Sequence, residues 1–167
     1  LAAQADVLVE NFKVGGLTRY GLGYEQLSAE NPRLVYLSIS AFGQDGPDAA
    51  KPGYDAMIQG MGGLMSLTGV PDGEPGAGPQ KVGVAVADLM CGMYAVSAII
   101  AALYERDRSG RGQSIDLSLL DTQVAWLANQ NLNYLVSGKP PRRQGTAHPN
   151  IVPYQSFETA DGYLMLA

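Results

Sequence analysis

Histidine and cysteine are almost absent from this 167-residue chain, which contains one of each, His148 and Cys91. A single cysteine excludes an internal disulfide framework and is compatible with a reducing compartment. The sequence also has no cysteine and histidine cluster at metal-ligand spacing, no glycine-rich dinucleotide or nucleoside-triphosphate fingerprint, and no serine elbow. The chain therefore lacks the usual sequence signals of a metal site, of NAD or ATP binding, and of serine hydrolysis.

Runs of one charge and long apolar runs are missing as well. The chain has 11 basic and 16 acidic residues and a net charge of −5, which does not indicate a nucleic-acid partner or an anionic membrane surface. Its main apolar run, residues 89–103, is shorter than the ~18–20 residues that span a bilayer. We therefore expect a buried core helix, no membrane partner, and a location in the cytoplasm, or in mitochondria if the source is eukaryotic.

The hydrophobic pattern predicts an α/β protein. Strand-like segments at 6–12 and 33–42 flank a short helix at 24–30, which is a βαβ pattern typical of a parallel sheet covered on both faces. Another strand is predicted at 113–119 and further helices at 54–68, 88–106 and 120–136. We expect a Rossmann-like parallel sheet with flanking helices in residues 1–139, as an incomplete large domain. A basic, proline-rich linker at 140–150 then leads to the start of a smaller α+β domain at 151–167, with a turn at 160–162.

The ends of the sequence suggest an internal piece of a longer protein. Its first residues are typical of a helix that runs into a strand, and its last residues are typical of a strand. We therefore expect that part of any site lies outside these 167 residues.

One carboxylate, Asp88, lies between a small apolar run and the long apolar helix. Aspartate is a preferred N-cap residue, so a capping role is the simpler interpretation. The positive end of the helix dipole would also favour the ionised carboxylate, which could act as a covalent nucleophile. The pattern alone leaves both roles open. His148, before Pro149, is predicted to be a loop histidine, and Cys91 a buried structural thiol.

Motifs along the whole chain together resemble those of the class III coenzyme A-transferases, the family of formyl-CoA transferase and carnitine CoA-transferase. No single motif decides the resemblance, but their order and spacing are specific. They lie at residues 9–12, 21–24, 31–35, 40–47, 52–55, 62–63, 86–88, 110–113, 115–116 and 148–155.

The resemblance implies a reaction and a set of site residues. Asp88 would be the catalytic residue, attacking an acyl-CoA thioester to start the transfer of CoA to a free carboxylic acid. Asn11, Phe12, Arg19 and Tyr54 would bind coenzyme A. The resemblance also implies no metal, no tightly bound cofactor, coenzyme A or acyl-CoA as substrate, and an interlocked homodimer for the full-length protein.

Two alternatives stay open at this point. The racemase and epimerase branch resembles the same pattern but has a histidine where this chain has Tyr54, and exchange of an α-proton between two faces needs two acid/base groups. Tyrosine, with an ordinary pKa of about 10, is a poor substitute. The chain could also be a non-catalytic CoA-binding portion. Within the transferases, Arg142 and Arg143 with residues 145–155 resemble the branch that acts on dicarboxylates, such as succinyl-CoA:glutarate CoA-transferase.

Overall fold

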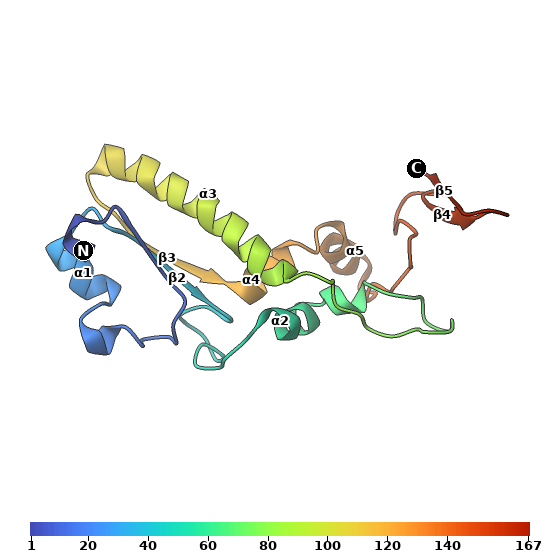
Figure 1. The fold of residues 1–167 in the computed structure, drawn as a ribbon, viewed down its shortest axis with the longest axis horizontal. Helices are drawn as coiled ribbons and strands as arrows, with labels where there is room; N and C mark the ends of the chain where they lie inside the picture. Colours follow the sequence, from blue (N-terminus) through green and yellow to red (C-terminus); the bar gives the residue numbers. More distant parts are fainter.

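The computed structural model describes residues 1–167 and is organised around a three-stranded parallel sheet with the order β1-β2-β3 (Figure 1). The predicted strands and the first helix form close to their expected positions. In chain order, the elements are η1 (Ala2–Gln4), β1 (Val7–Glu10), η2 (Thr18–Tyr20), α1 (Tyr24–Glu30), β2 (Val35–Ser40), α2 (Asp55–Met61), η3 (Leu64–Ser66), α3 (Val86–Ser109), β3 (Ser114–Ser118), α4 (Leu119–Ala125), α5 (Asn129–Ser137), β4 (Gln155–Glu158) and β5 (Tyr163–Leu166).

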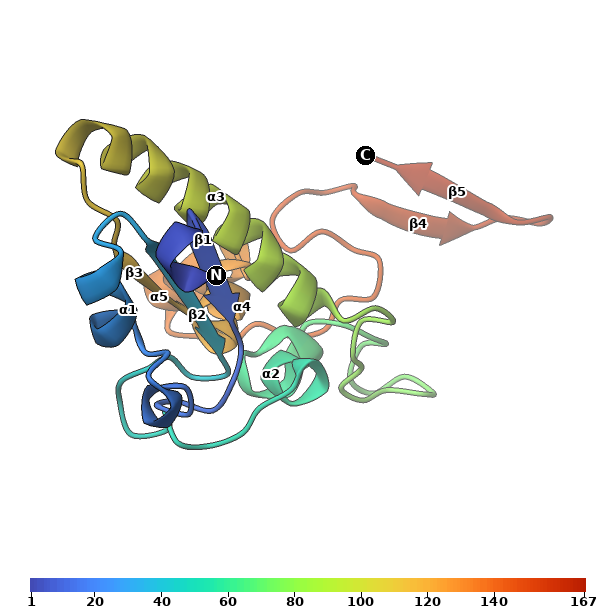
Figure 2. The same cartoon turned by 60° about the vertical axis from the view of Figure 1, so that its left-hand side comes forward.

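The central strand, β2, is covered on both faces, as its apolar sequence predicts. Val35, Tyr36, Leu37 and Ser38 are all buried. Tyr36 packs with Leu34 and with Leu27 of α1 on one face, whereas Ile39 and Ala41 pack with the beginning of α3 on the other. Figure 2 shows α1 and α3 on opposite sides of the sheet. The α/β prediction is confirmed.

Helix α3 is longer than predicted and is covered on one side only. Its small residues Ala87, Cys91, Ala95 and Ala102 are buried, and its contacts are with β2, β3, α2 and α4. Its large apolar residues point outward and are more than half exposed: Leu89, Met93, Val96, Ile100 and Tyr104. The expectation of an all-round buried helix is therefore wrong within residues 1–167, because the sheet receives only the small-residue side.

By length and composition alone, α3 is apolar enough to cross a membrane. That test does not separate a membrane span from a core helix, and here α3 packs on a parallel sheet and on two other helices. The contacts are those of a helix layer in an α/β fold.

Two predicted helices are divided. Residues 54–68 form α2 and η3 with a break at Gly63, whose φ of +87° is a left-handed conformation that favours glycine. Residues 120–136 form α4 and α5 with a break at Ala128, which has a φ of +48°. Periodic apolar residues continue through both breaks, so spacing alone predicted one helix in each case.

The C-terminal strands β4 and β5 form an antiparallel hairpin across the predicted turn at 160–162. Both views show this hairpin projecting from the rest of the molecule (Figures 1 and 2). Residues between α5 and β4 contain no helix or strand. The domain boundary near residue 140 stays a prediction.

Candidate active site

A cleft of about 520 Å³ opens at the carboxyl ends of the three parallel strands. This edge of an open α/β sheet is where ligands bind, because the loops that leave the strands diverge there. The loop after β1, the end of β2, the loop before α2, the first turns of α3 and the start of α4 all contribute. The polar, charged and aromatic residues of the lining that could contact a ligand include Asn11, Phe12, Lys13, Lys51, Tyr54 and Asp88.

Asp88 lies at the cleft but does not cap its helix. The N-cap position is Ala85, which makes no side-chain cap hydrogen bond, and Asp88 is the third residue of α3. The side chain is exposed rather than committed to the backbone. The interpretation of Asp88 as N-cap is therefore wrong, and its carboxylate is free to face a ligand.

The capping bond comes from the neighbouring helix α2. Asp55 Oδ1 accepts a hydrogen bond from the backbone N–H of Ala87 at 2.8 Å, and Asp55 Oδ2 accepts one from Gln59 Nε2 at 2.8 Å. A carboxylate at a helix N-terminus satisfies a backbone donor that has no partner within the helix. Asp55 thereby joins the start of α3 to α2.

The pKa of Asp88 lies above its ordinary value, first because the surrounding protein partly desolvates this exposed carboxylate and second because the Asp55 charge repels it. The sequence pattern indicated only the dipole of α3, which favours the ionised form, and predicted neither of these two effects. A carboxylate that is less well solvated is also a stronger nucleophile once it is ionised.

The predicted coenzyme A residues divide into two groups. Asn11, Phe12 and Tyr54 line the same cleft as Asp88. Tyr54, directly before α2, is 79% exposed. Arg19 does not line the cleft, and its guanidinium lies 4.7 Å from the centre of the Tyr20 ring.

The turn after β1 is held by a buried carboxylate. Glu10 is 9% exposed, and its Oε2 accepts a hydrogen bond from the backbone N–H of Phe12 at 2.8 Å. This bond fixes the direction in which Asn11 and Phe12 leave the strand. The same charge contributes, after burial, to the raised pKa of Tyr36.

Cys91 and His148 take the structural positions that the sequence predicts. Cys91 is 1% exposed, one helical turn after Asp88, and burial raises the pKa of its thiol. His148 lies between α5 and β4, where its Nδ1 accepts from the backbone N–H of Asn150 and its ring packs beside Tyr154. The cleft lining contains no histidine.

Sequence reasoning missed four residues of this region: Lys13, Lys51, Asp55 and Gln59. Lys13 follows Phe12, and Asp55 follows Tyr54, so adjacency to the predicted residues was an available signal for both. Lys51 pairs with Asp48 at 2.6 Å. Gln59 bonds to Asp55 on its own helix, but its other two bonds reach residues more than 20 positions away, which no local pattern reveals.

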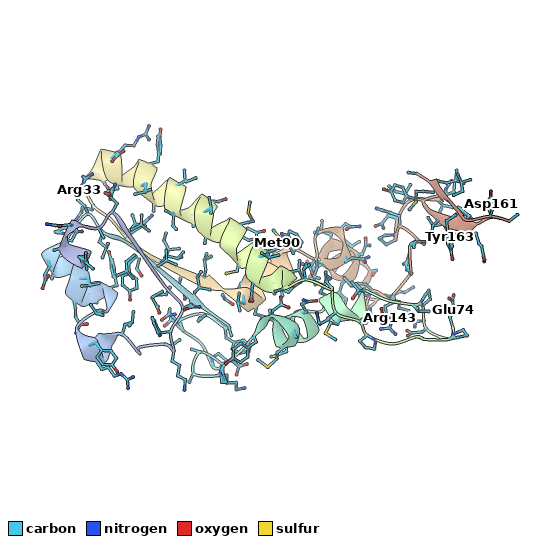
Figure 3. The ribbon with its side chains drawn as sticks, viewed as in Figure 1. Arg33, Glu74, Met90, Arg143, Asp161 and Tyr163 are labelled. Carbon is cyan, nitrogen blue, oxygen red and sulfur yellow. The ribbon has the colours of Figure 1, made fainter.

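Arg142 and Arg143 lie outside the cleft lining. Arg143 pairs with Asp72 and donates to the carbonyl oxygen of Val70. Figure 3 shows Arg143 beside the loop that carries Glu74 and away from Arg33 at the other end of the molecule. The Arg143 guanidinium is thus occupied by partners within the chain.

Comparison with known proteins gives a consistent result. Residues 1–167 match the model of CoA-transferase family III. A succinate–glutarate CoA-transferase of Agrobacterium fabrum is 59% identical over 167 residues, which are 100% of this chain and 41% of that protein. A succinyl-CoA:glutarate CoA-transferase of Mus musculus is 48% identical over 99% of this chain and 37% of that protein.

Among solved structures, a CAIB/BAIF family protein from Brucella suis superposes with a TM-score of 0.89 at 57% identity. The alignment covers 99% of this chain and 43% of that one. The chain thus spans about two fifths of the length of the proteins it matches.

Proposed function

The chain belongs to CoA-transferase family III, and from this premise we propose that the full-length protein transfers coenzyme A from an acyl-CoA thioester to a free carboxylic acid, through a covalent intermediate at Asp88. One observation carries the proposal. An exposed aspartate without a capping bond faces a cleft at the carboxyl ends of the parallel strands.

The first half of the reaction removes the acyl group from CoA and then loads CoA onto the protein. The ionised Asp88 oxygen attacks the thioester carbonyl, the C–S bond breaks, and CoA leaves as a thiolate, so that a mixed anhydride forms. The thiolate then attacks the Asp88 carbonyl carbon. The anhydride C–O bond breaks, the donor acid leaves as a carboxylate, and an aspartyl-CoA thioester remains.

The second half runs through the same bonds in reverse. The acceptor carboxylate attacks the aspartyl thioester, which releases CoA thiolate and forms a new anhydride. The thiolate attacks the acceptor's acyl carbon, which gives the new acyl-CoA and the free Asp88 carboxylate. An aspartyl anhydride keeps the activation of the thioester, so no net energy input is needed.

The cleft offers groups that suit coenzyme A. We assign Asn11, Phe12 and Tyr54 to binding of the CoA chain near Asp88, because all of these residues line one cleft. Lys13 and Lys51 bring positive charge to the same lining and would attract phosphate or carboxylate oxygens. Arg19 is assigned to the CoA phosphates on the resemblance alone, since it lies outside the lining.

Racemisation is the less favoured function. It needs a second acid/base group on the far side of the reacting carbon. The titratable groups of the lining besides Asp88 are Lys13, Lys51, Tyr54 and the protonated thiol of Cys91. None of them is a histidine or a carboxylate, the residue types that usually perform this exchange near neutral pH.

For the donor and acceptor we propose succinyl-CoA and glutarate or a similar dicarboxylate. The support is the 59% and 48% identity to proteins that are named for these acids. Arg142 and Arg143 are not assigned to the second carboxylate, because Arg143 is occupied by Asp72 and Val70.

The test uses the full-length protein with succinyl-CoA and glutarate. Hydroxylamine added during turnover is expected to give a hydroxamate on the peptide that contains Asp88, detected by mass spectrometry, and Asp88→Asn is expected to give none. Asp121→Asn is the matched control, because Asp121 is also the third residue of its helix and is exposed. Full activity in the Asp88→Asn protein would exclude the proposal. Proton exchange of a 2-methylacyl-CoA in D₂O without transfer would favour racemisation.

We also propose a homodimer for the full-length protein, in the cytoplasm or, in a eukaryote, in mitochondria. Family membership supports the dimer. The single free cysteine supports a reducing compartment. Light scattering of the purified protein tests the dimer, and a monomer at working concentration would exclude it.

A further inference from the structure

A buried amide lies behind the start of α3. Gln59, on α2, is fully buried, at 0% exposed. Its Nε2 donates to Asp55 Oδ2 at 2.8 Å and to the carbonyl oxygen of Val84 at 3.3 Å, and its Oε1 accepts from the backbone N–H of Val82 at 2.8 Å. Two of these bonds reach the segment that enters α3, the third reaches Asp55 of α2, and none of these residues lines the cleft.

The bonds form one connected path to Asp88. Gln59 orients the Asp55 carboxylate, Asp55 accepts from the N–H of Ala87, and Ala87 directly precedes Asp88. The two remaining bonds fix residues 82–84, which lead into the first turn of α3. Gln59 thus holds the residues that lead into Asp88, directly at Val82 and Val84 and through Asp55 at Ala87.

We propose that Gln59 is a positioning residue for the Asp88 nucleophile. It holds Asp55 against the first turn of α3 and fixes residues 82–84 before that turn, so that the Asp88 carboxylate keeps one orientation in the cleft. This inference rests on the proposed function for its catalytic part, but the geometric part stands on the hydrogen bonds alone.

A carboxamide suits this position for a physical reason. It donates to a carboxylate and to a carbonyl oxygen while it accepts from an N–H, and it does so without adding charge. A glutamate here would keep the bond to Val82 but lose both donors and place a second negative charge beside Asp55. A methionine would keep the volume and leave Asp55, Val82 and Val84 with unsatisfied groups.

The chain offers a matched control in Gln123 of α4. Gln123 is also an amide and 2% exposed, and it packs against α2, where its Cγ would lie 2.6 Å from a Cβ at Gly62. Its Nε2 has no hydrogen-bond partner. Substitution of Gln123 therefore changes packing without breaking a bond that leads to Asp88.

The first experiment compares Gln59→Met with Gln123→Met in the full-length protein. Gln59→Met is expected to lower kcat about tenfold with KM for the CoA donor within about twofold of wild type, because misplacement of a reacting group affects the chemical step. Gln123→Met is expected to keep kcat within about twofold. A Gln59→Met kcat within twofold of wild type, or an equal loss in both variants, would overturn the proposal.

Gln59→Glu adds a readout that a purely structural role would not move. The groups facing Asp88 are Asp55 from α2, the buried Cys91 thiol on its own helix, and Tyr54, Lys13 and Lys51 across the cleft. A new carboxylate beside Asp55 raises the pKa of Asp88 further, so the acid limb of the kcat profile moves to higher pH. An unmoved acid limb would contradict the proposal.

Hydrogen exchange separates this inference from the proposed function. In Gln59→Met, amide exchange of a peptide over residues 82–90 is expected to speed up about tenfold relative to wild type and to Gln123→Met. If wild-type protein shows no CoA transfer but the exchange result holds, the proposed function fails and the positioning role stands. If transfer occurs and exchange is unchanged, the positioning role fails.

Discussion

The two ends of α3 are both held by polar side chains from or near the core, but they differ in charge and in what lies beside them. At the N-terminal end, Asp55 and Gln59 hold the first turn, and a second carboxylate, Asp88, lies at the open cleft. At the C-terminal end, Arg106 is 9% exposed, donates to the carbonyl oxygens of Asp6 and Arg33, and pairs with the Asp6 carboxylate at 2.9 Å.

The N-terminal end of α3 lies at the proposed active site, whereas the contacts at its C-terminal end stabilise the fold. Opposite charges meet at the C-terminal end, where Arg106 also complements the helix dipole. Like charges meet at the N-terminal end, where partial desolvation and, second, the Asp55 charge raise the pKa of Asp88. Active sites commonly retain groups that lower stability, because the chemistry needs them. Substitutions at the two ends should therefore have opposite consequences for activity and for folding.

The largest effect is expected from Asp88→Asn in the full-length protein. If Asp88 is the nucleophile proposed above, its loss should reduce transfer by about 10³-fold or more. The pKa of Asp88 is raised in the folded state, so the protonated form is favoured by folding. This stabilising contribution is present below the unfolded pKa and is lost as pH rises through the folded pKa.

The variant should consequently have a higher Tm than wild type at neutral pH, and this difference should disappear at acid pH, where wild-type Asp88 is protonated. Thermal unfolding at pH 7.5 and at an acid pH below the ordinary aspartate value of 3.8, together with transfer assays, checks both parts. A lower Tm at neutral pH would show that the charge of Asp88 is compensated by groups other than those described.

The next largest effect is expected from Gly112→Ala, just beyond the C-terminal end of α3. A Cβ on Gly112 would lie 2.0 Å from the carbonyl oxygen of Leu34, and backbone cannot move aside as a side chain can. We expect a loss of about 3 kcal/mol of unfolding free energy, measured with denaturant, with unchanged kcat per folded molecule. Gly92→Ala in α3 meets nothing within 4 Å and should not destabilise, which makes it the control for stability.

Arg106→Met should have a smaller effect of the same kind. It leaves the carbonyl oxygens of Asp6 and Arg33 without their buried donor, at a cost of about 2 kcal/mol. Transfer activity per folded molecule should not change, because Arg106 lies at the end of α3 away from the cleft. Arg108→Met is the control, since Arg108 is exposed and stacks on Tyr104. A fall in kcat with unchanged stability in Arg106→Met would show that the C-terminal end of α3 also affects activity.

The sequence predicted the fold well where apolar pattern decides the structure. The buried run of β2 and the alternating burial of β3 both follow from side-chain period, and α1 begins and ends where expected. It failed at Gly63 and Ala128, where the chain adopts positive φ inside periodic segments. The prediction that α3 is buried on all sides also failed. The apolar pattern shows that a side chain favours burial, but not whether another part of these 167 residues covers it.

For the site, the sequence and the family resemblance indicated Asp88, and the structure brings Asn11, Phe12 and Tyr54 to the same cleft. The cap was assigned to Asp88 instead of Asp55, because Asp55 reaches Ala87 from another helix, 32 positions away in sequence. The raised pKa of Asp88 was not predicted either, because its causes are partial desolvation first and the charge of Asp55 second. Electrostatics at a helix end depends on neighbours in space, which a linear pattern does not show.

A smaller effect is expected from Asp55→Asn. Removal of this charge should lower the pKa of Asp88, so the acid limb of the kcat profile should move to lower pH. The weaker cap should cost up to about 1 kcal/mol of stability. A pH–rate series and thermal unfolding measure the two effects, with Asp121→Asn as the control. An acid limb that moves to higher pH would show that Asp55 orients Asp88 more than it repels it.

The smallest effect is expected at Cys91, which lies one turn along α3 from Asp88 and is 1% exposed. Burial raises the pKa of its thiol most, the neighbouring Thr122 hydroxyl lowers it, and the Asp88 charge raises it. Because burial is the largest cause, Asp88→Asn should speed alkylation of Cys91 by iodoacetamide at pH 8 by less than about threefold. Thr122→Val should slow the same reaction, since it removes the hydroxyl that favours the thiolate. Equal rates in Asp88→Asn and Thr122→Val would mean that access to the thiol, rather than its charge state, limits the reaction. The charge of Asp88 would then have no measurable effect on the thiol one turn along the helix.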